Sequence, residues 1–233
     1  MGRRMFIGGL PYQPAYWWIT PRSNAGGDLA SRQPWRNLLA HLEQFVPNWQ
    51  TLPIASTLQP FPYPVLQKAM LRGINSPTAS SAGRLFDAIS AALGICKQQM
   101  SWEGEGACQL EALARQSVLK QHPVSLPVIG QQLDLKTFWQ QWLRYSAPDA
   151  ERAHAFHVAL AQGFADLAHQ AAHRYEINKV VLSGGVMHNL LLRQLLVEKL
   201  QPLDVLYARQ LPMGDGGLAL GQAAIATAQI KDE

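Results

Sequence analysis

The sequence predicts an α/β protein that is helix-rich over most of its length and ends in a βαβα unit. Apolar side chains recur at helical spacing through much of residues 34–175. Two short strand-like runs, 179–182 and 204–207, follow, and a glycine-rich turn comes after each of them. The chain has 233 residues, 48% of them apolar, which is enough to bury a substantial core.

The helix-rich part can be divided by its punctuating residues. Residues 1–25 are predicted to be irregular, because prolines and glycines interrupt the aromatic residues without any helical or strand period. Pro34 is tolerated in a first helical turn, and Ser81 and Asp134 are placed to cap later helices. The predicted helices are 34–46, 65–71, 81–93, 106–115, 135–145 and a longer one from 149, with a short hairpin or edge strands inside 122–135.

The last 55 or so residues change pattern to strand, turn, helix, strand, turn, helix. Residues 179–182 form a continuous run typical of a buried parallel strand. A helix is expected to end near residue 200, a second strand to cover 204–207, and the last helix to cover 218–229. Both glycine-rich turns then lie at the carboxyl ends of neighbouring parallel strands, the edge where open α/β sheets bind ligands.

Composition excludes several classes of function. The formal net charge is only +4, and Lys and Arg are scattered, so we expect no nucleic-acid partner. The sequence has no apolar run of the roughly 18–20 residues that a membrane span needs, so we expect no membrane partner. Two cysteines do not form a disulfide framework, which favours reduced thiols and a cytoplasmic location.

The first candidate site is the segment Ser183-Gly-Gly-Val-Met-His-Asn189. Backbone N–H groups of Gly184 and Gly185, at the start of a helix, could hold a phosphate. The alternative is a tight turn that simply requires glycine. Asn189 could contact a base or a ribose, or only cap the helix.

The second candidate is Gly214-Asp-Gly-Gly217, where Asp215 could ligate a metal ion or act only as a helix cap. The third is the helix start around Asp87, a carboxylate that we expect to be exposed to the cleft and to accept from ribose hydroxyls. Its alternative is a surface ion pair with Arg84. Gly104 offers a further turn where a ligand could approach the backbone closely.

The spacing of His169 and His173 fits two metal ligands on one helix face, but the apolar stripe of that helix favours solvated or packing histidines.

These motifs, in this order, resemble the C-terminal part of the HypF family, the carbamoyltransferases of [NiFe]-hydrogenase maturation; tRNA threonylcarbamoyl-adenosine synthase is a more distant match. The resemblance covers residues 26–233 and leaves 1–25 as a divergent start. It implies part of an actin/Hsp70/sugar-kinase-like ATPase domain, which is ribonuclease H-like, with a helix-rich insert before the βαβα unit. The motifs that carry it are Gly26-Gly-Asp-Leu29, Pro34-Trp-Arg36, Ser81–Ala88, Glu103-Gly104, Ser183–Asn189 and Gly214–Gln222.

The resemblance implies an ATP-dependent transferase. The carbamoyl group would pass from carbamoyl-adenylate, made from carbamoyl phosphate and ATP, to the C-terminal cysteine of a HypE-type partner. Asp87 and Gly104 would contact the nucleotide, Asn189 its adenine side, and Gly184 and Gly185 its phosphate. Asp215 would be the single ligand that this half gives to a divalent metal, iron or zinc, with Mg accompanying the nucleotide. The resemblance assigns no catalytic residue within this chain.

The chain also departs from the family pattern. The family's metal site takes a histidine pair from an earlier half of the module, and no His-rich run precedes His41. His188 stands where a glutamine is usual. We therefore expect a fragment with an incomplete site, which binds metal poorly and is inactive alone. The alternative is a non-catalytic nucleotide-binding or interaction module. A sugar-kinase relative would need an upstream phosphate loop, which the chain lacks.

Overall fold

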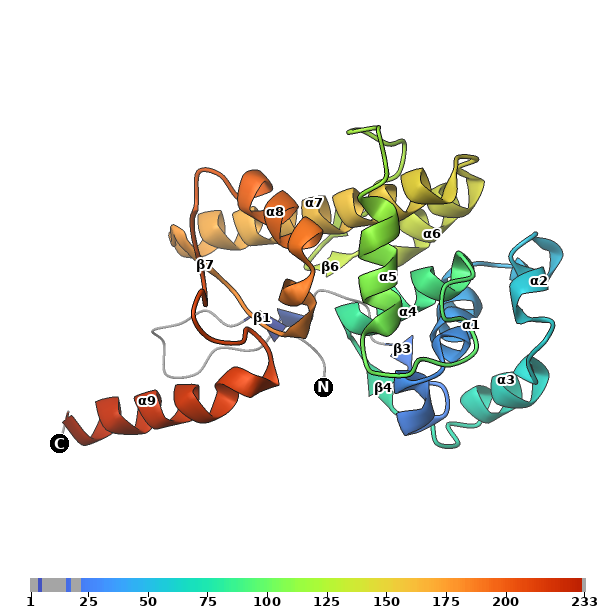
Figure 1. Ribbon diagram of the computed structural model, residues 1–233, viewed down its shortest axis with the longest axis horizontal. Helices are drawn as coiled ribbons and strands as arrows, with labels where there is room; N and C mark the ends of the chain where they lie inside the picture. Colours follow the sequence, from blue (N-terminus) through green and yellow to red (C-terminus); the bar gives the residue numbers. More distant parts are fainter. Residues whose placement is uncertain (1–3, 6–15, 18–21, 232–233) are drawn as a thin grey trace.

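The computed structural model describes residues 4–5, 16–17 and 22–231 (Figure 1). The irregular start predicted for residues 1–25 therefore lies largely outside the described residues. The described residues contain four short strand pairs. Three are antiparallel: β1 (Arg4–Met5) with β2 (Tyr16–Trp17), β3 (Arg22–Ser23) with β4 (Thr78–Ala79), and β5 (Val128–Ile129) with β6 (Gln132–Leu133). The last of these is the hairpin that the sequence predicts.

Every predicted helix is present, within a few residues at each end. The structure adds the short helix α2, which was not among the predicted helices. The α-helices are α1 (Pro34–Phe45), α2 (Ala55–Leu58), α3 (Tyr63–Leu71), α4 (Ala82–Ala92), α5 (Glu105–Ala114), α6 (Leu135–Arg144), α7 (Asp149–Tyr175), α8 (Leu190–Lys199) and α9 (Leu218–Lys231). The 3₁₀ turns are η1 (Gly27–Ser31), η2 (Trp49–Thr51), η3 (Gly185–His188) and η4 (Asp215–Gly217).

Predicted capping residues begin two of these helices. Ser81 Oγ accepts from the backbone N–H of Arg84, at the first turn of α4. Asp134 Oδ1 accepts from the N–H groups of Lys136 and Thr137 at 3.0 and 3.1 Å. These three bonds satisfy donors that a helix start leaves without a partner, which fixes where α4 and α6 begin.

The core is a layer of helices in which α1 packs on α4, α4 on α5, and α5 on the long helix α7 (Figure 1). Aromatic side chains fill its centre, with the rings of Phe86 and Phe156 edge to face at 4.8 Å. Phe138, Trp139 and Trp142 of α6 are fully buried beside them. Packing of this kind contributes about 0.5–1.5 kcal/mol per aromatic pair beyond area burial.

The C-terminal βαβα unit has the predicted order: β7 (Lys179–Leu182), α8, β8 (Asp204–Tyr207) and α9. The two strands pair in parallel, from Lys179 opposite Asp204 to Leu182 opposite Tyr207. The prediction of a buried strand is wrong for one face, on which Val181 is 68% exposed and Leu206 44% exposed. In the described part of the chain, the core covers only the other face, which carries Val180 and Leu182.

Candidate functional site

The two glycine-rich turns meet at the carboxyl ends of β7 and β8, as the βαβα pattern predicts. The backbone N–H of Gly184 donates to the carbonyl of Met213 at 2.5 Å, and Ser183 Oγ donates to the same carbonyl at 3.3 Å. A Cβ on Gly214 would lie 3.4 Å from the Cα of Gly185. These contacts hold the turns against each other as one structural unit.

Backbone conformation explains why this unit needs glycine. Gly184 has φ 99° and ψ 160°, a region that residues with a side chain almost never adopt. A Cβ on Gly217 would lie 2.5 Å from the carbonyl oxygen of Pro212. Strain at Gly184 and a steric clash at Gly217 therefore both require glycine.

Three polar side chains surround these turns in exposed positions: Ser183, His188 and Asp215. His188 lies against the second turn, since a Cβ on Gly214 would be 3.4 Å from its Nε2. The described residues contain no group of three or more His, Cys, Asp or Glu side chains that could hold a metal ion. The side chains present around Asp215 therefore do not make a complete metal centre.

Asn189 lies directly after the first turn and is buried. Its Oδ1 accepts from the N–H of Leu192 at 2.8 Å, so it is the N-cap of α8, one of the two roles that the sequence allowed. Its Nδ2 donates to His157 Nε2 at 3.0 Å. A contact between Asn189 and an adenine stays a prediction, and it would have to use the second N–H of the amide.

His157 was not identified as a partner of the site from sequence. Its ring is fully buried in α7, and its Nδ1–H donates to the carbonyl of Ala153 at 2.8 Å. Burial lowers the pKa of His157 from 6.5 to about 4, because the charged imidazolium would lose its hydration. His157 is therefore a neutral packing histidine, as favoured for this helix.

The structure contradicts the expected exposure of Asp87. Its side chain is buried, and only 3% of the residue is exposed. Oδ2 accepts from Arg84 Nη1 at 2.7 Å and from Asn37 Nδ2 at 3.4 Å. The physical reason is that this face of α4 packs against α1, and helical spacing within α4 could not show which neighbour covers it. The predicted ion pair with Arg84 exists, but it is largely buried instead of lying on the surface.

Arg84 joins several of the motifs. Besides Asp87, it donates to the carbonyl of Ala30 at 3.3 Å and to Glu103 Oε1 at 3.0 Å. Gly104 follows directly, in a left-handed conformation with φ 92°, and begins α5. The motif segments around residues 26–30, 81–88 and 103–104 therefore meet at one guanidinium group.

Asn37 is a residue that sequence reasoning missed. Its Nδ2 donates to the carbonyl of Ala30 at 2.6 Å, and the side chain is buried. Helical spacing places Asn37 away from the apolar stripe of the predicted helix 34–46, so the sequence carried no signal for its burial.

Two groups of candidate residues thus exist, and an aromatic contact links them. Asp87 and Gly104 belong to the group around Arg84, whereas Gly184, Gly185, Asn189 and Asp215 belong to the glycine turns. Phe86, next to Asp87, contacts the ring of His157 edge to face at 5.3 Å. His157 in turn holds Asn189, so α4, α7 and the start of α8 are packed as one body.

His169 and His173, the two histidines considered as metal ligands, do not take part in this link between the two groups. His169 Nε2 lies 3.0 Å from the carbonyl oxygen of Lys199, which ties α7 to the end of α8. His173 is exposed.

Among the described helices, none is both long enough and apolar enough to cross a membrane.

Comparisons with known proteins support the resemblance. Residues 15–222 match the family model described as "Carbamoyltransferase, Kae1-like Domain, second subdomain". A carbamoyltransferase HypF of Rhodobacter capsulatus is 38% identical over 216 residues, which are 92% of this chain and 28% of that protein. A HypF homolog of Cupriavidus necator is 36% identical, over 88% of this chain and 55% of that protein.

Solved structures of HypF proteins also match this chain. The crystal structure of full-length HypF in its phosphate- and nucleotide-bound form superposes with a TM-score of 0.80 at 25% identity, covering 93% of this chain and 29% of that one. HypF of T. kodakarensis gives 0.80 at 26% identity, covering 94% of this chain and 31% of that one. The chain thus spans less than two thirds of these relatives, and its mixed, helix-rich α/β fold matches theirs. By sequence and by fold, the chain belongs to the family of the second subdomain of the HypF carbamoyltransferase Kae1-like domain.

Proposed function

We propose that this chain forms one half of a carbamoyl-adenylate site, from which a carbamoyl group passes to the C-terminal cysteine of a HypE-type protein. The observation that carries the proposal is the meeting of two glycine-rich turns at the carboxyl ends of β7 and β8. Open α/β sheets bind nucleotides at this edge. The relative that was solved with phosphate and nucleotide supports the same ligand class for this chain.

Each candidate residue has a role in this proposal. Gly184 and Gly185 flank the phosphate, because a turn without Cβ atoms lets an anion approach the backbone. The N–H of Gly184 is bonded to the Met213 carbonyl, so the N–H of Gly185 is the donor in this proposal. Asn189 faces the adenine. Asp87 and Gly104 contribute from the Arg84 group, with Asp87 positioning Arg84 and Asn37 from its buried place.

Asp215 contributes one metal ligand, which leaves the other ligands to a further part of the family domain. Carbamoyl phosphate and ATP supply the carbamoyl-adenylate, and Mg accompanies the nucleotide. The metal of the site itself would be iron or zinc.

An uncovered sheet face supports the view that the chain works as part of a larger domain of the actin/Hsp70-like, ribonuclease H-like class. Parallel sheets are normally covered on both faces, and two strands alone are marginally stable. Here Val181 and Leu206 are exposed as a cross-strand pair. Helix α9 runs away from the other helices (Figure 1), with Leu218, Leu220 and Ile225 more than half exposed. We propose that the remaining strands of the domain cover these surfaces.

Charge and cysteine content complete the proposal. The weak net charge of +4 favours small-molecule substrates and a protein partner over nucleic acid. Cys96 and Cys108 are both free thiols, which is compatible with the cytoplasm.

A second candidate is a nucleotide-binding module without chemistry. The lone, exposed carboxylate of Asp215 favours it, since one carboxylate cannot hold a transition metal tightly against water.

Calorimetry with a non-hydrolysable ATP analogue and a stable carbamoyl-adenylate analogue tests the nucleotide site. We expect binding to the chain, lost in Gly184→Ala and kept in Gly221→Ala, whose added Cβ meets nothing within 4 Å. Binding that is unaffected by Gly184→Ala would contradict the assignment of the turns.

A transfer assay separates the two candidates. The chain is mixed with a HypE-type protein, carbamoyl phosphate and ATP, with and without a separately made remainder of a HypF protein. Carbamoyl-cysteine formed only with the remainder supports the half-site. No product in either mixture, together with nucleotide binding, supports the module without chemistry. Stoichiometric iron or zinc in the chain alone, lost in Asp215→Asn, together with carbamoylation by the chain alone, contradicts the half-site.

A further inference from the structure

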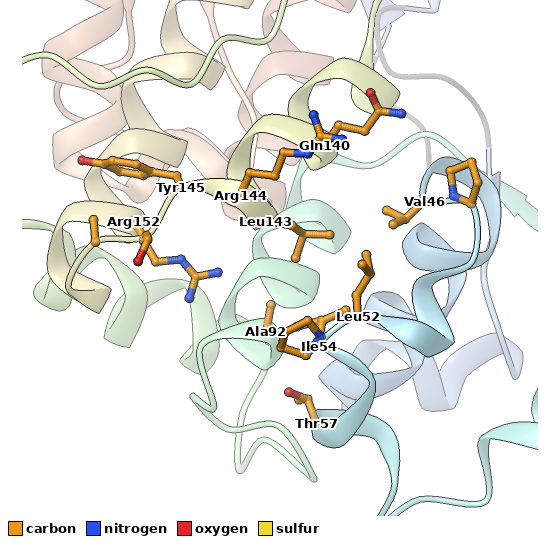
Figure 2. A pocket seen from close by; sticks show the side chains of 14 residues that line it. Val46, Leu52, Ile54, Thr57, Ala92, Gln140, Leu143, Arg144, Tyr145 and Arg152 are labelled. Atoms are coloured by element: carbon orange, nitrogen blue, oxygen red, sulfur yellow. The ribbon is translucent and has the colours of Figure 1, made fainter.

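A pocket of about 590 Å³ lies away from the glycine turns, where the segment after α1 faces the end of α6 and the start of α7 (Figure 2). That size falls within the range of about 300–1,000 Å³ that small-molecule sites occupy. None of the six candidate nucleotide or metal residues lines it. The lining residues are Val46, Pro47, Leu52, Pro53, Ile54, Thr57, Ala92, Gln140, Leu143, Arg144, Tyr145, Ser146, Ala147 and Arg152.

The walls are mostly apolar, and the charged residues among the described lining are two arginines. Leu52, Ile54 and Leu143 lie near the centre, Arg152 lies at one side, and the Arg144 side chain extends toward Gln140 (Figure 2). Among the described residues that line the pocket, none carries a carboxylate. A cavity with aliphatic walls and two guanidinium groups selects an anion that has an apolar body.

Arg152 is held in place before any ligand arrives. Its guanidinium stacks over the ring of Trp142 at 4.1 Å, and Trp142 Nε1 donates to the Arg152 carbonyl at 3.0 Å. The side chain is 19% exposed, and its one carboxylate partner, Asp149, is 3.5 Å away and 59% exposed. Its enclosed Nε has no acceptor among the described residues. Arg152 is thus a fixed, weakly neutralised cation, which costs little ordering when it binds an anion.

Arg144 provides a second cation at the same pocket. It is exposed, and it forms no ion pair with a residue in the described part of the chain. A carboxylate can accept two parallel N–H bonds from one guanidinium group, a geometry that an ammonium group does not offer.

We propose that this pocket binds a small organic carboxylate with an aliphatic or aromatic body. The carboxylate pairs with Arg152, Arg144 adds positive charge at the edge of the pocket, and the body lies among Leu52, Ile54 and Leu143. A purely inorganic anion would leave these aliphatic walls in water. A neutral apolar molecule would leave the two arginines without an anion.

Ligand-observed NMR on the whole chain tests this with two matched probes, hexanoate and hexanamide, which share the apolar body and differ in charge. We expect saturation transfer to hexanoate, with its chain protons most affected, and binding of hexanamide weaker by about tenfold or more. Acetate, which lacks the body, should bind more weakly than hexanoate.

Variants localise the site. Arg144→Gln should weaken hexanoate binding by about tenfold. Arg152→Lys, which keeps the charge but loses the two parallel N–H donors of the guanidinium group, should weaken it by several-fold. Arg72→Gln is the control, because it removes the same charge from an exposed position outside the pocket. Equal binding of hexanoate and hexanamide, no binding of hexanoate at millimolar concentration, or equal effects of Arg144→Gln and Arg72→Gln would overturn the proposal.

Discussion

The amide of Asn189 donates to His157 Nε2 at 3.0 Å, across 32 residues of sequence. Since His157 Nδ1–H donates to the Ala153 carbonyl, the imidazole is neutral and carries its proton on Nδ1. This bond ties the first glycine turn to the buried middle of α7. The position of a turn proposed to hold phosphate therefore depends on a histidine outside every motif.

Two substitutions of Asn189 distinguish the contributions of its two hydrogen bonds. Asn189→Ala removes the cap of α8 and leaves Nε2 of His157 without a donor, so we expect a loss of about 2–4 kcal/mol in the free energy of unfolding, measured by urea denaturation. Asn189→Asp keeps the cap and places a carboxylate beside His157. We expect that variant to raise the pKa of His157 in an NMR titration. A loss below about 0.5 kcal/mol for Asn189→Ala would contradict this account.

Stability should depend on pH through His157. Its folded pKa is about 4 and its reference value 6.5, so protons bind the unfolded chain more readily. The stabilisation is complete above pH 6.5 and is lost as the pH falls toward 4, by on the order of 3 kcal/mol in all. Burial lowers the pKa values of His122 and His154 too, and these act in the same direction. Glu111 opposes the shift of His157, and Arg115 adds to it.

Urea midpoints measured between pH 8 and pH 4.5 check this dependence. His157→Gln should flatten the curve, whereas His173→Gln, at an exposed position, should leave it as in the parent chain. An increase in stability as the pH falls through this window would refute the assignment.

The buried pair of Arg84 and Asp87 gives a third prediction. Asp87→Ala should destabilise the chain by about 3 kcal/mol, because Arg84 would remain largely buried without its buried carboxylate and would keep only the exposed Glu103. In a double-mutant cycle, Arg84→Ala and Asp87→Ala should couple by about 1–3 kcal/mol. Their effect on nucleotide affinity, measured on the folded fraction, tests the binding role separately. Additive effects of the two changes would rule out the pair as a stabilising unit.

Two glycines in helices should respond in opposite directions to alanine. A Cβ on Gly163 in α7 would lie 2.7 Å from both the Leu126 carbonyl oxygen and Leu133 Cδ2, so Gly163→Ala should cost about 1–3 kcal/mol despite the better helix propensity of alanine. A Cβ on Gly221 in α9 meets nothing within 4 Å, so Gly221→Ala should be neutral or stabilising by up to about 1 kcal/mol. Thermal unfolding compares the two, and equal shifts would contradict the close packing at Gly163.

The sequence by itself determined the local elements. Caps such as Ser81 and Asp134, and the strand-like runs at 179–182 and 204–207, act over a few residues, so their outcome is visible in the chain. The meeting of the two glycine turns was also predictable, because parallel strands joined by a helix bring their carboxyl ends together. The order of the motifs along the chain was enough to predict the family.

Only the tertiary structure decided what covers each side chain. Asp87 became buried because Asn37 of α1 and the Ala30 carbonyl of η1 lie against α4, in contacts 50 or more residues apart in sequence. Val181 became exposed because the described chain packs a core on one face of β7 only. Periodicity gives the direction in which a side chain points within its own element. Which other element lies in that direction depends on the packing of the whole chain.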